Sequence, residues 1–163
     1  MECDVTDFAA VDRAFAAAEA RHGPVEVLVA NAGITADMLL MQMDEAEFVR
    51  VVDTNLMGAY WVARRAVGPM VLMRRGRMIF MSSVSGLSGA AGQANYAASK
   101  AGLVGLARSL ARELGGSGIT VNVVAPGYVR TDMTERLTDR RREELMGQIA
   151  LRRVAEPRGS PTR

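Results

Sequence analysis

The sequence contains one lysine, one cysteine and one histidine among its 163 residues. A single cysteine, Cys3, excludes an internal disulfide and fits a reducing compartment, so we expect a cytoplasmic protein. Cys3 has no histidine or second cysteine near it in the sequence, and we therefore expect no metal site. His22 stands where a predicted helix ends at Gly23 and Pro24, which favours a solvated helix terminus over a catalytic base.

Long apolar runs and a signal-peptide core are also lacking. No stretch is long enough to span a membrane, and the first residues are acidic, so neither a membrane anchor nor a leader is expected. Apolar residues make up 49% of the chain and charged residues 23%, which is ordinary for a globular domain of this length.

Nineteen arginines supply almost all of the positive charge. From Arg136 to the end there are eight arginines against four acidic residues, while residues 1–135 carry a net charge of −2. Such an end could meet nucleic acid, but no aromatic platform or recognition motif accompanies it, and a solvated helix face explains it as well. We therefore expect no nucleic-acid partner.

Short β-branched runs alternate with longer helical patterns, which predicts βαβ units and a parallel, doubly wound α/β sheet. Residues 82–93 are small and predict a flexible loop. The predicted strands are 2–5, 25–30, 77–81 and 119–125, and the predicted helices are 6–21, 44–74, 95–114 and 131–154.

Polar or backbone-shaping residues follow three of these strands. Ligands of a doubly wound sheet bind beyond the carboxyl ends of its strands, so these residues are candidates for one site. They are Asn31 and Gly33 after the second strand, Ser82 and Ser83 after the third, and Pro126 and Gly127 after the fourth.

Tyr96 and Lys100 open the helix that follows Ser83, and Lys100 is the only lysine. Positions four residues apart share a helix face, and an ammonium beside a phenol lowers the phenol pKa. Tyr96 is therefore a candidate proton donor, with a surface lysine near a half-buried tyrosine as the plain alternative.

Together these motifs resemble the short-chain dehydrogenase/reductase superfamily. Asn31 to Gly33, Asn55, Ser83, Tyr96 and Lys100 occur in that family's order, with Ser83 thirteen residues before Tyr96. The stretches 92–102 and 119–127 are similar to the 3-oxoacyl-[acyl-carrier-protein] reductase branch, and 76–100 is similar to its actinobacterial members. The resemblance covers residues 1–155.

The resemblance implies a role for each of four catalytic residues. Tyr96 would protonate the substrate carbonyl oxygen, and Ser83 would hydrogen-bond that oxygen. Lys100 would lower the pKa of Tyr96 and hold the nicotinamide ribose, while Asn55 would anchor a water of the proton relay. Without the resemblance, Asn55 is a satisfied amide inside a helix, and Ser82 is a structural residue.

The resemblance further implies reduction of a 3-oxoacyl thioester, carried on acyl carrier protein, in fatty-acid biosynthesis. NADPH is the expected cofactor, with NAD as the alternative. The implied cofactor contacts are Asp4, Val5, Asn31, Gly33, Tyr96, Lys100, Pro126, Gly127, Val129 and Thr131. Family members associate through helices such as those beginning near Asp44 and Asn95, so a homodimer or homotetramer is expected.

The family's fold begins with a strand, a glycine-rich turn and a helix that holds the pyrophosphate, and this motif does not occur here. We expect an incomplete Rossmann-like sheet without the first two strands and the last one. Its domain would span 1–155, followed by a basic tail at 156–163 outside the family pattern. A misassigned start and a frameshift are the hypotheses that sequencing the gene would test.

An incomplete sheet would leave strand 25–30 as an exposed apolar edge and remove most of the adenosine site. Weak cofactor binding and slow turnover follow. The rival interpretation is an impaired fragment that retains only self-association through its helices. Arg74 and Arg75 could meet an acidic carrier protein or simply form a solvated helix end.

Overall fold

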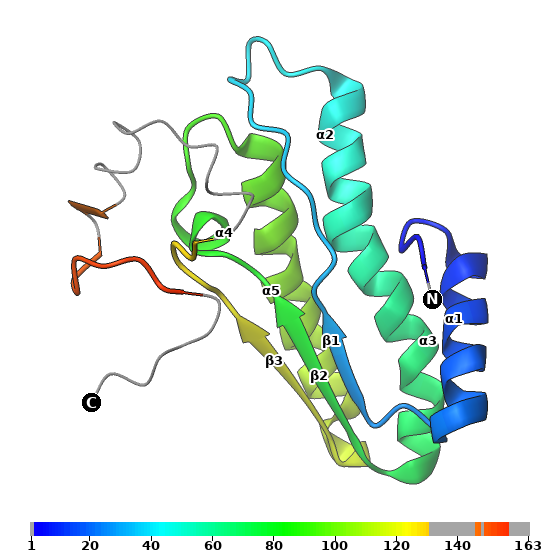
Figure 1. The fold of residues 1–163 in the computed structure, drawn as a ribbon. Coiled ribbons are helices and arrows are strands. Elements are labelled where there is room, and N and C mark those ends of the chain that lie inside the picture. Colours follow the sequence, from blue (N-terminus) through cyan, green and yellow to red (C-terminus); the bar gives the residue numbers. More distant parts are fainter. Residues whose placement is uncertain (1, 131–145, 148, 157–163) are drawn as a thin grey trace. The chain divides into compact units, whose positions relative to one another are not determined.

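The computed structural model describes residues 2–130, 146–147 and 149–156 of the chain (Figure 1). The chain divides into two compact units, Met1–Ala125 and Pro126–Arg163, which are treated separately below. The domain limits expected from the sequence, 1–155 and 156–163, stay a prediction.

The first unit is built on a parallel sheet of three strands, β1 (Val27–Ala30), β2 (Gly76–Met81) and β3 (Ile119–Val124). β2 lies in the middle, with Ala30 beside Phe80 on one side and Val123 beside Phe80 on the other. Helices connect the strands, because parallel neighbours need long crossovers. The predicted parallel α/β, Rossmann-like class is therefore confirmed.

The helices begin at side chains that accept hydrogen bonds from the first turn. Asp7 Oδ1 accepts from Ala9 N, and Asp44 Oδ1 accepts from Ala46 N, as their types predict. The helical elements are α1 (Phe8–His22), α2 (Glu45–Val52), the π-helical η1 (Asp53–Met57), α3 (Gly58–Met73), α4 (Val84–Ser88), α5 (Ala94–Leu114) and the 3-10 turn η2 (Gly115–Ser117). None of the helices that the structure describes is long and apolar enough to cross a membrane.

The core lies between the sheet and the helices α3 and α5, which cover one of its faces (Figure 1). Met78 and Phe80 of β2 are fully buried against small residues of these helices, among them Ala66 and Ala107. Small residues let a helix approach a sheet closely, and this packing fixes α5 beneath the carboxyl end of β2.

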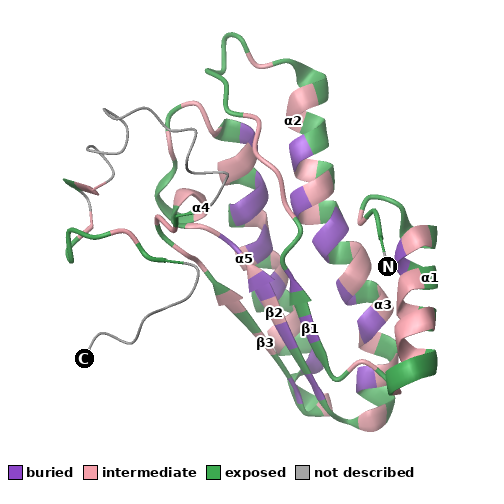
Figure 2. Cartoon of the chain, in the orientation of Figure 1, coloured by how far each residue is buried: buried purple, intermediate pink, exposed green. Residues whose placement is uncertain are grey.

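β1 forms an edge of the sheet. Its residues alternate between exposed and buried (Figure 2). The residues Val27 and Val29 are 58% and 52% exposed. Parallel strands are usually buried on both faces, so two exposed valines on an edge strand are unusual. The exposed apolar edge that the sequence predicted at this strand is confirmed.

Three predictions need correction. Residues 2–5 form no strand, because the Asp4 carboxylate instead accepts hydrogen bonds from Thr6 N and Thr6 Oγ1 and holds a turn. The 82–93 segment is not simply a loop, since Ser83 caps the short helix α4, which contains Gly86. The predicted helix 131–154 falls mostly outside the described residues, but 149–153 form turns, so it does not extend to Val154.

Candidate active site

Tyr96 lies in the first turn of α5 and is half-buried. Burial raises the pKa of its phenol, a hydrogen bond with Ser83 lowers it in part, and the negative charge of Asp37 raises it again. The net direction is upward. Desolvation thus outweighs the lowering by Ser83. The expectation that Lys100 lowers the pKa of Tyr96 stays a prediction.

Ser83 reaches Tyr96 because α4 begins directly after β2. Its backbone is extended, and its hydroxyl also accepts a bond of 3.2 Å from Ser85 N at the helix start. The neighbouring Ser82 is buried and donates to Lys100 O over 2.8 Å, which agrees with the structural role expected for it. Ser83 and Tyr96 thus form the polar pair that sequence spacing predicted.

Lys100 stands one turn beyond Tyr96, and its side chain is almost fully buried. Its Nζ donates to Met81 O, the last carbonyl of β2, over 2.7 Å, and lies 5.6 Å from the centroid of the Tyr96 ring. Burial lowers the pKa of Lys100. A buried ammonium against a strand-end carbonyl is not the surface lysine of the plain alternative.

Asn55 occupies a π-helical stretch between α2 and α3, where Gly58 N donates to Asp53 O five residues back. Such bulges are rare and concentrate at functional sites. The Asn55 amide is 1% exposed, accepts from Ile34 N and donates to both Ile34 O and Ser99 Oγ. It therefore clamps the segment after β1 to the helices, and its role toward a water stays a prediction.

Gly33 faces two of these catalytic candidates. A Cβ on Gly33 would lie 3.1 Å from Asn55 Oδ1 and 3.3 Å from Lys100 Nζ. Gly33 therefore brings the backbone after β1 close to both side chains, as the sequence suggested.

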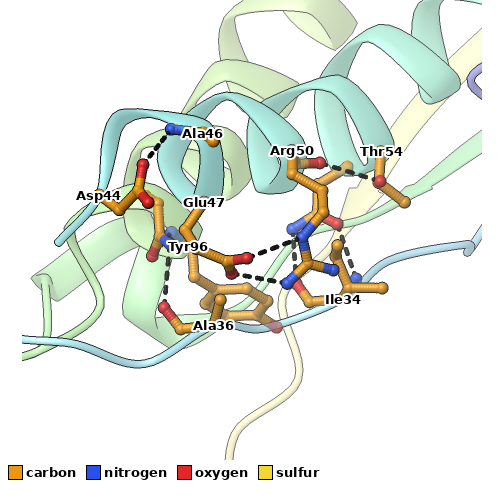
Figure 3. Close-up of polar contacts among 10 residues, drawn as sticks. Ile34, Ala36, Asp44, Ala46, Glu47, Arg50, Thr54 and Tyr96 are labelled. Atoms are coloured by element: carbon orange, nitrogen blue, oxygen red, sulfur yellow. Dashed lines mark hydrogen bonds and ion pairs between the residues drawn. The ribbon is translucent and has the colours of Figure 1, made fainter.

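The segment after β1 runs between η1 and α5, near Tyr96 (Figure 3). Two residues that hold it, Asn95 and Ser99, were not among the predicted site residues. Asn95 Nδ2 donates to Ala36 O, and Ser99 Oγ donates to Tyr96 O. Both are fully buried in the first turns of α5. Short polar side chains at these positions are the sequence signal that could have indicated them.

The remaining predicted cofactor residues are less closely tied to the cluster. Asn31 and Asp4 are exposed, and Val5 packs where a Cβ on Gly58 would stand, one helical turn beyond Asn55. Pro126, Gly127 and Val129 belong to the second unit, where Val129 pairs with Ala155. Thr131 lies outside the described residues.

The described residues contain no group of three or more histidine, cysteine or acidic side chains that could hold a metal ion. The sequence model described as short chain dehydrogenase matches residues 1–142. The chain belongs to this family.

Several of the similar curated proteins are 3-oxoacyl-[acyl-carrier-protein] reductases by name. MabA of Mycobacterium tuberculosis is 55% identical over 157 residues, which is 96% of this chain and 64% of that protein. FabG of Escherichia coli is 45% identical over 151 residues, which is 93% of this chain and 62% of that protein. The chain thus spans somewhat less than two thirds of the length of these relatives.

Proposed function

We propose that this short-chain dehydrogenase chain reduces a 3-oxoacyl thioester to the 3-hydroxyacyl form, with NADPH as the reductant and acyl carrier protein as the thioester's carrier. The observation that carries the proposal is the cluster of Ser83, Tyr96, Lys100 and Asn55 at the carboxyl end of β2. The names of the relatives, which share half of the aligned residues, support the choice of substrate.

Tyr96 suits the role of general acid. A phenol with a raised pKa stays protonated near neutral pH, so a proton is available throughout the physiological range. As the carbonyl oxygen of the substrate gains the electron pair of the C=O π bond, the Tyr96 O–H proton moves to it. The resulting phenolate regains its proton from solvent.

Ser83 and Lys100 assist Tyr96 from two sides. The Ser83 hydroxyl, already hydrogen-bonded to Tyr96, can donate to the same carbonyl oxygen and stabilise its developing charge. The Lys100 ammonium stabilises the phenolate that remains after proton transfer, because a positive charge near a phenolate favours the ionised form.

The chain's residues fit a nicotinamide cofactor at the segment after β1. Gly33 leaves no side chain between the backbone and Lys100 Nζ, and the only hydrogen bond that the described residues offer Nζ is Met81 O, so two N–H groups remain for ribose hydroxyls. When bound, the reduced cofactor supplies a hydride to the carbonyl carbon. Asn31 and Gly33 would hold its nicotinamide end, with Val5 and Asp4 toward its adenine.

The rival is a chain that keeps the catalytic cluster without effective cofactor binding and retains only self-association. The exposed apolar edge at β1, with Val27 and Val29, favours this second candidate.

Loss of NADPH absorbance with an acetoacetyl thioester tests the two candidates. We expect turnover in the full chain and a fall of about 10³-fold in Tyr96→Phe, since one positioned general acid contributes 10²–10⁴-fold. Tyr60→Phe is the matched control, because Tyr60 is an exposed tyrosine on α3 that packs on Trp61.

Equal turnover in Tyr96→Phe and Tyr60→Phe would contradict the proposal. Absence of both turnover and NADPH binding, together with association in gel filtration, would favour the rival. Replacing NADPH with NADH in the same assay decides the choice of cofactor.

A further inference from the structure

We propose that Asn95 is a positioning residue for Tyr96, joining the start of α5 to the segment after β1 and fixing where the phenol is presented. The proposal deepens the proposed function, and its turnover measurements rest on that function. Two of its tests, a titration and amide exchange, do not depend on activity.

Asn95 uses both ends of its amide within a fully buried site. Its Oδ1 accepts from Tyr96 N over 2.7 Å, and its Nδ2 donates to Ala36 O over 3.0 Å. The Asn95 side chain thus joins Tyr96, which carries the phenol, to Ala36 in the segment after β1. A buried amide with both ends bonded strongly determines the relative position of its partners.

The start of α5 needs such a bond. Gln93, the residue before the helix, makes no side-chain cap bond, although the first N–H groups of a helix have no partner inside it. Asn95 satisfies one of them, Tyr96 N–H, from inside the first turn. Loss of Asn95 would therefore free the backbone of the catalytic candidate itself.

The carbonyl of Tyr96 is held as well. Ser99 Oγ donates to Tyr96 O over 2.7 Å and accepts from Asn55 Nδ2 over 3.0 Å. Buried polar side chains therefore bind the backbone of Tyr96 at both its N–H and its C=O. Asn95 also bonds to Ala36, and Ser99 is connected through Asn55 to Ile34, so both side chains are linked to the segment after β1.

The bond from Asn95 to Ala36 is one of several that join residues 36–38 to residues 92–95, a contact line called the seam below. Asp37 Oδ2 accepts from Gln93 Nε2 over 2.8 Å, and Met38 N donates to Gly92 O over 2.8 Å. The two side-chain bonds differ in burial, since the Gln93 bond is exposed and the Asn95 bond is partly buried. Gln93 therefore offers a matched control, an amide in the same seam that does not contact the Tyr96 backbone.

The first experiment compares Asn95→Ala with Gln93→Ala. In Asn95→Ala we expect kcat to fall about 10²-fold with little change in KM, because small displacements of a catalytic group cost this much. The phenol of Tyr96 should titrate at lower pH as the ring becomes less buried. Its absorbance signal is identified as the part of the titration that is absent in Tyr96→Phe. Gln93→Ala should retain the wild-type kcat.

The second experiment separates positioning from general support of the fold. Asn95→Asp keeps an acceptor for Tyr96 N–H and loses the donor to Ala36 O. Amide hydrogen exchange should leave Tyr96 N–H protected in this variant, while the amide of Met38, at the far end of the seam, exchanges faster.

The proposal is overturned if Asn95→Ala folds cooperatively and keeps both the Tyr96 titration and the Tyr96 amide protection of the wild type. Should Asn95→Ala fail to fold, Asn95→Asp decides, and unchanged Met38 exchange together with unchanged kcat overturns the proposal. Should the wild type show no turnover, the proposed function fails, and the titration and exchange measurements still decide the role of Asn95.

Discussion

The two sides of the central strand β2 differ in how completely they are packed. Toward β3 and α5, Phe80, Leu103 and Ile119 are buried, and every deeply buried polar side-chain atom of the described residues has a hydrogen-bond partner. Toward β1, Val27 and Val29 are half exposed, and β1, like β3, is an edge strand of the sheet among the described residues. The catalytic candidates thus lie on elements between residues 27 and 114, while the exposed side chains of β1 have less cover.

Among the changes that test this comparison, Lys100→Arg should have the largest effect. Nζ occupies a space bounded by Met81 O and Gly33, and a guanidinium is larger and planar, so it cannot fit there without displacing them. We expect turnover to fall about 10²-fold, the scale of losing a positioned catalytic group, and stability to fall by about 1–3 kcal/mol from overpacking.

Kinetics and urea unfolding measure the two effects of Lys100→Arg. The control is Arg108→Lys, a basic exchange at an exposed position of the same helix, which should change neither. Wild-type turnover in Lys100→Arg would show that this side of the site needs only a positive charge.

Gly86→Ala tests the contact between α4 and α5. A Cβ at Gly86 would lie 2.8 Å from the backbone carbon of Lys100, and backbone atoms cannot move aside cheaply. We expect a loss of about 1–3 kcal/mol in the free energy of unfolding. Gly105→Ala is the matched control, since nothing lies near its Cβ, and the change should stabilise the helix by about 0.4–1 kcal/mol.

Sequence reasoning found the parallel sheet and the capping residues, and it indicated that Ser83, Tyr96 and Lys100 lie together, because strand patterns and motif spacing are local properties. It missed the short helix α4, whose Val84–Ser88 sequence of small residues carries weak helical propensity. It also predicted a strand at 2–5, where the Asp4 carboxylate instead holds a turn through Thr6.

The polar network could not be predicted in the same way. Asn95 and Ser99 acquire their meaning from contacts with Ala36 and Asn55, which are distant in sequence. Burial raises the pKa of Tyr96, and this was not predicted, because a spacing of four residues indicates a neighbouring charge but not the degree of burial.

A smaller effect is expected when the charge of Asp37 is removed. Asp37 raises the pKa of Tyr96, so Asp37→Asn should lower that pKa, and the phenol should ionise at a lower pH. A phenol whose pKa is raised in the folded state stabilises the fold fully below its ordinary value of about 10 and loses this contribution as pH rises through the folded pKa. Asp37→Asn should therefore make the alkaline loss of stability smaller, with the loss complete at a lower pH.

Absorbance titration and unfolding as a function of pH measure this prediction. Tyr96→Phe identifies the signal, because its loss leaves only the other tyrosines. An unchanged titration in Asp37→Asn would mean that the charge of Asp37 does not influence the phenol pKa.

Val29→Thr should have the smallest effect on stability and tests the open side. Threonine keeps the β-branched shape while adding a hydroxyl at a position already 52% exposed, so the free energy of unfolding should change by no more than about 0.5 kcal/mol. Self-association should fall, because an exposed apolar edge strand favours pairing with another chain. Light scattering over a range of concentrations measures it.

Thr120→Val on β3, the opposite edge strand, distinguishes the β1 edge from exposed apolar area elsewhere on the sheet face. Thr120 is exposed and lies in register with Arg77, which is in register with Val27, so valine there adds apolar area away from β1. If association depends on the β1 edge, Val29→Thr should reduce it and Thr120→Val should leave it unchanged. If Val29→Thr lowers association and Thr120→Val raises it, exposed apolar area on the sheet face is the cause. The two sides of β2 would then differ in how well the sheet face is covered, and not in the pairing of the β1 edge.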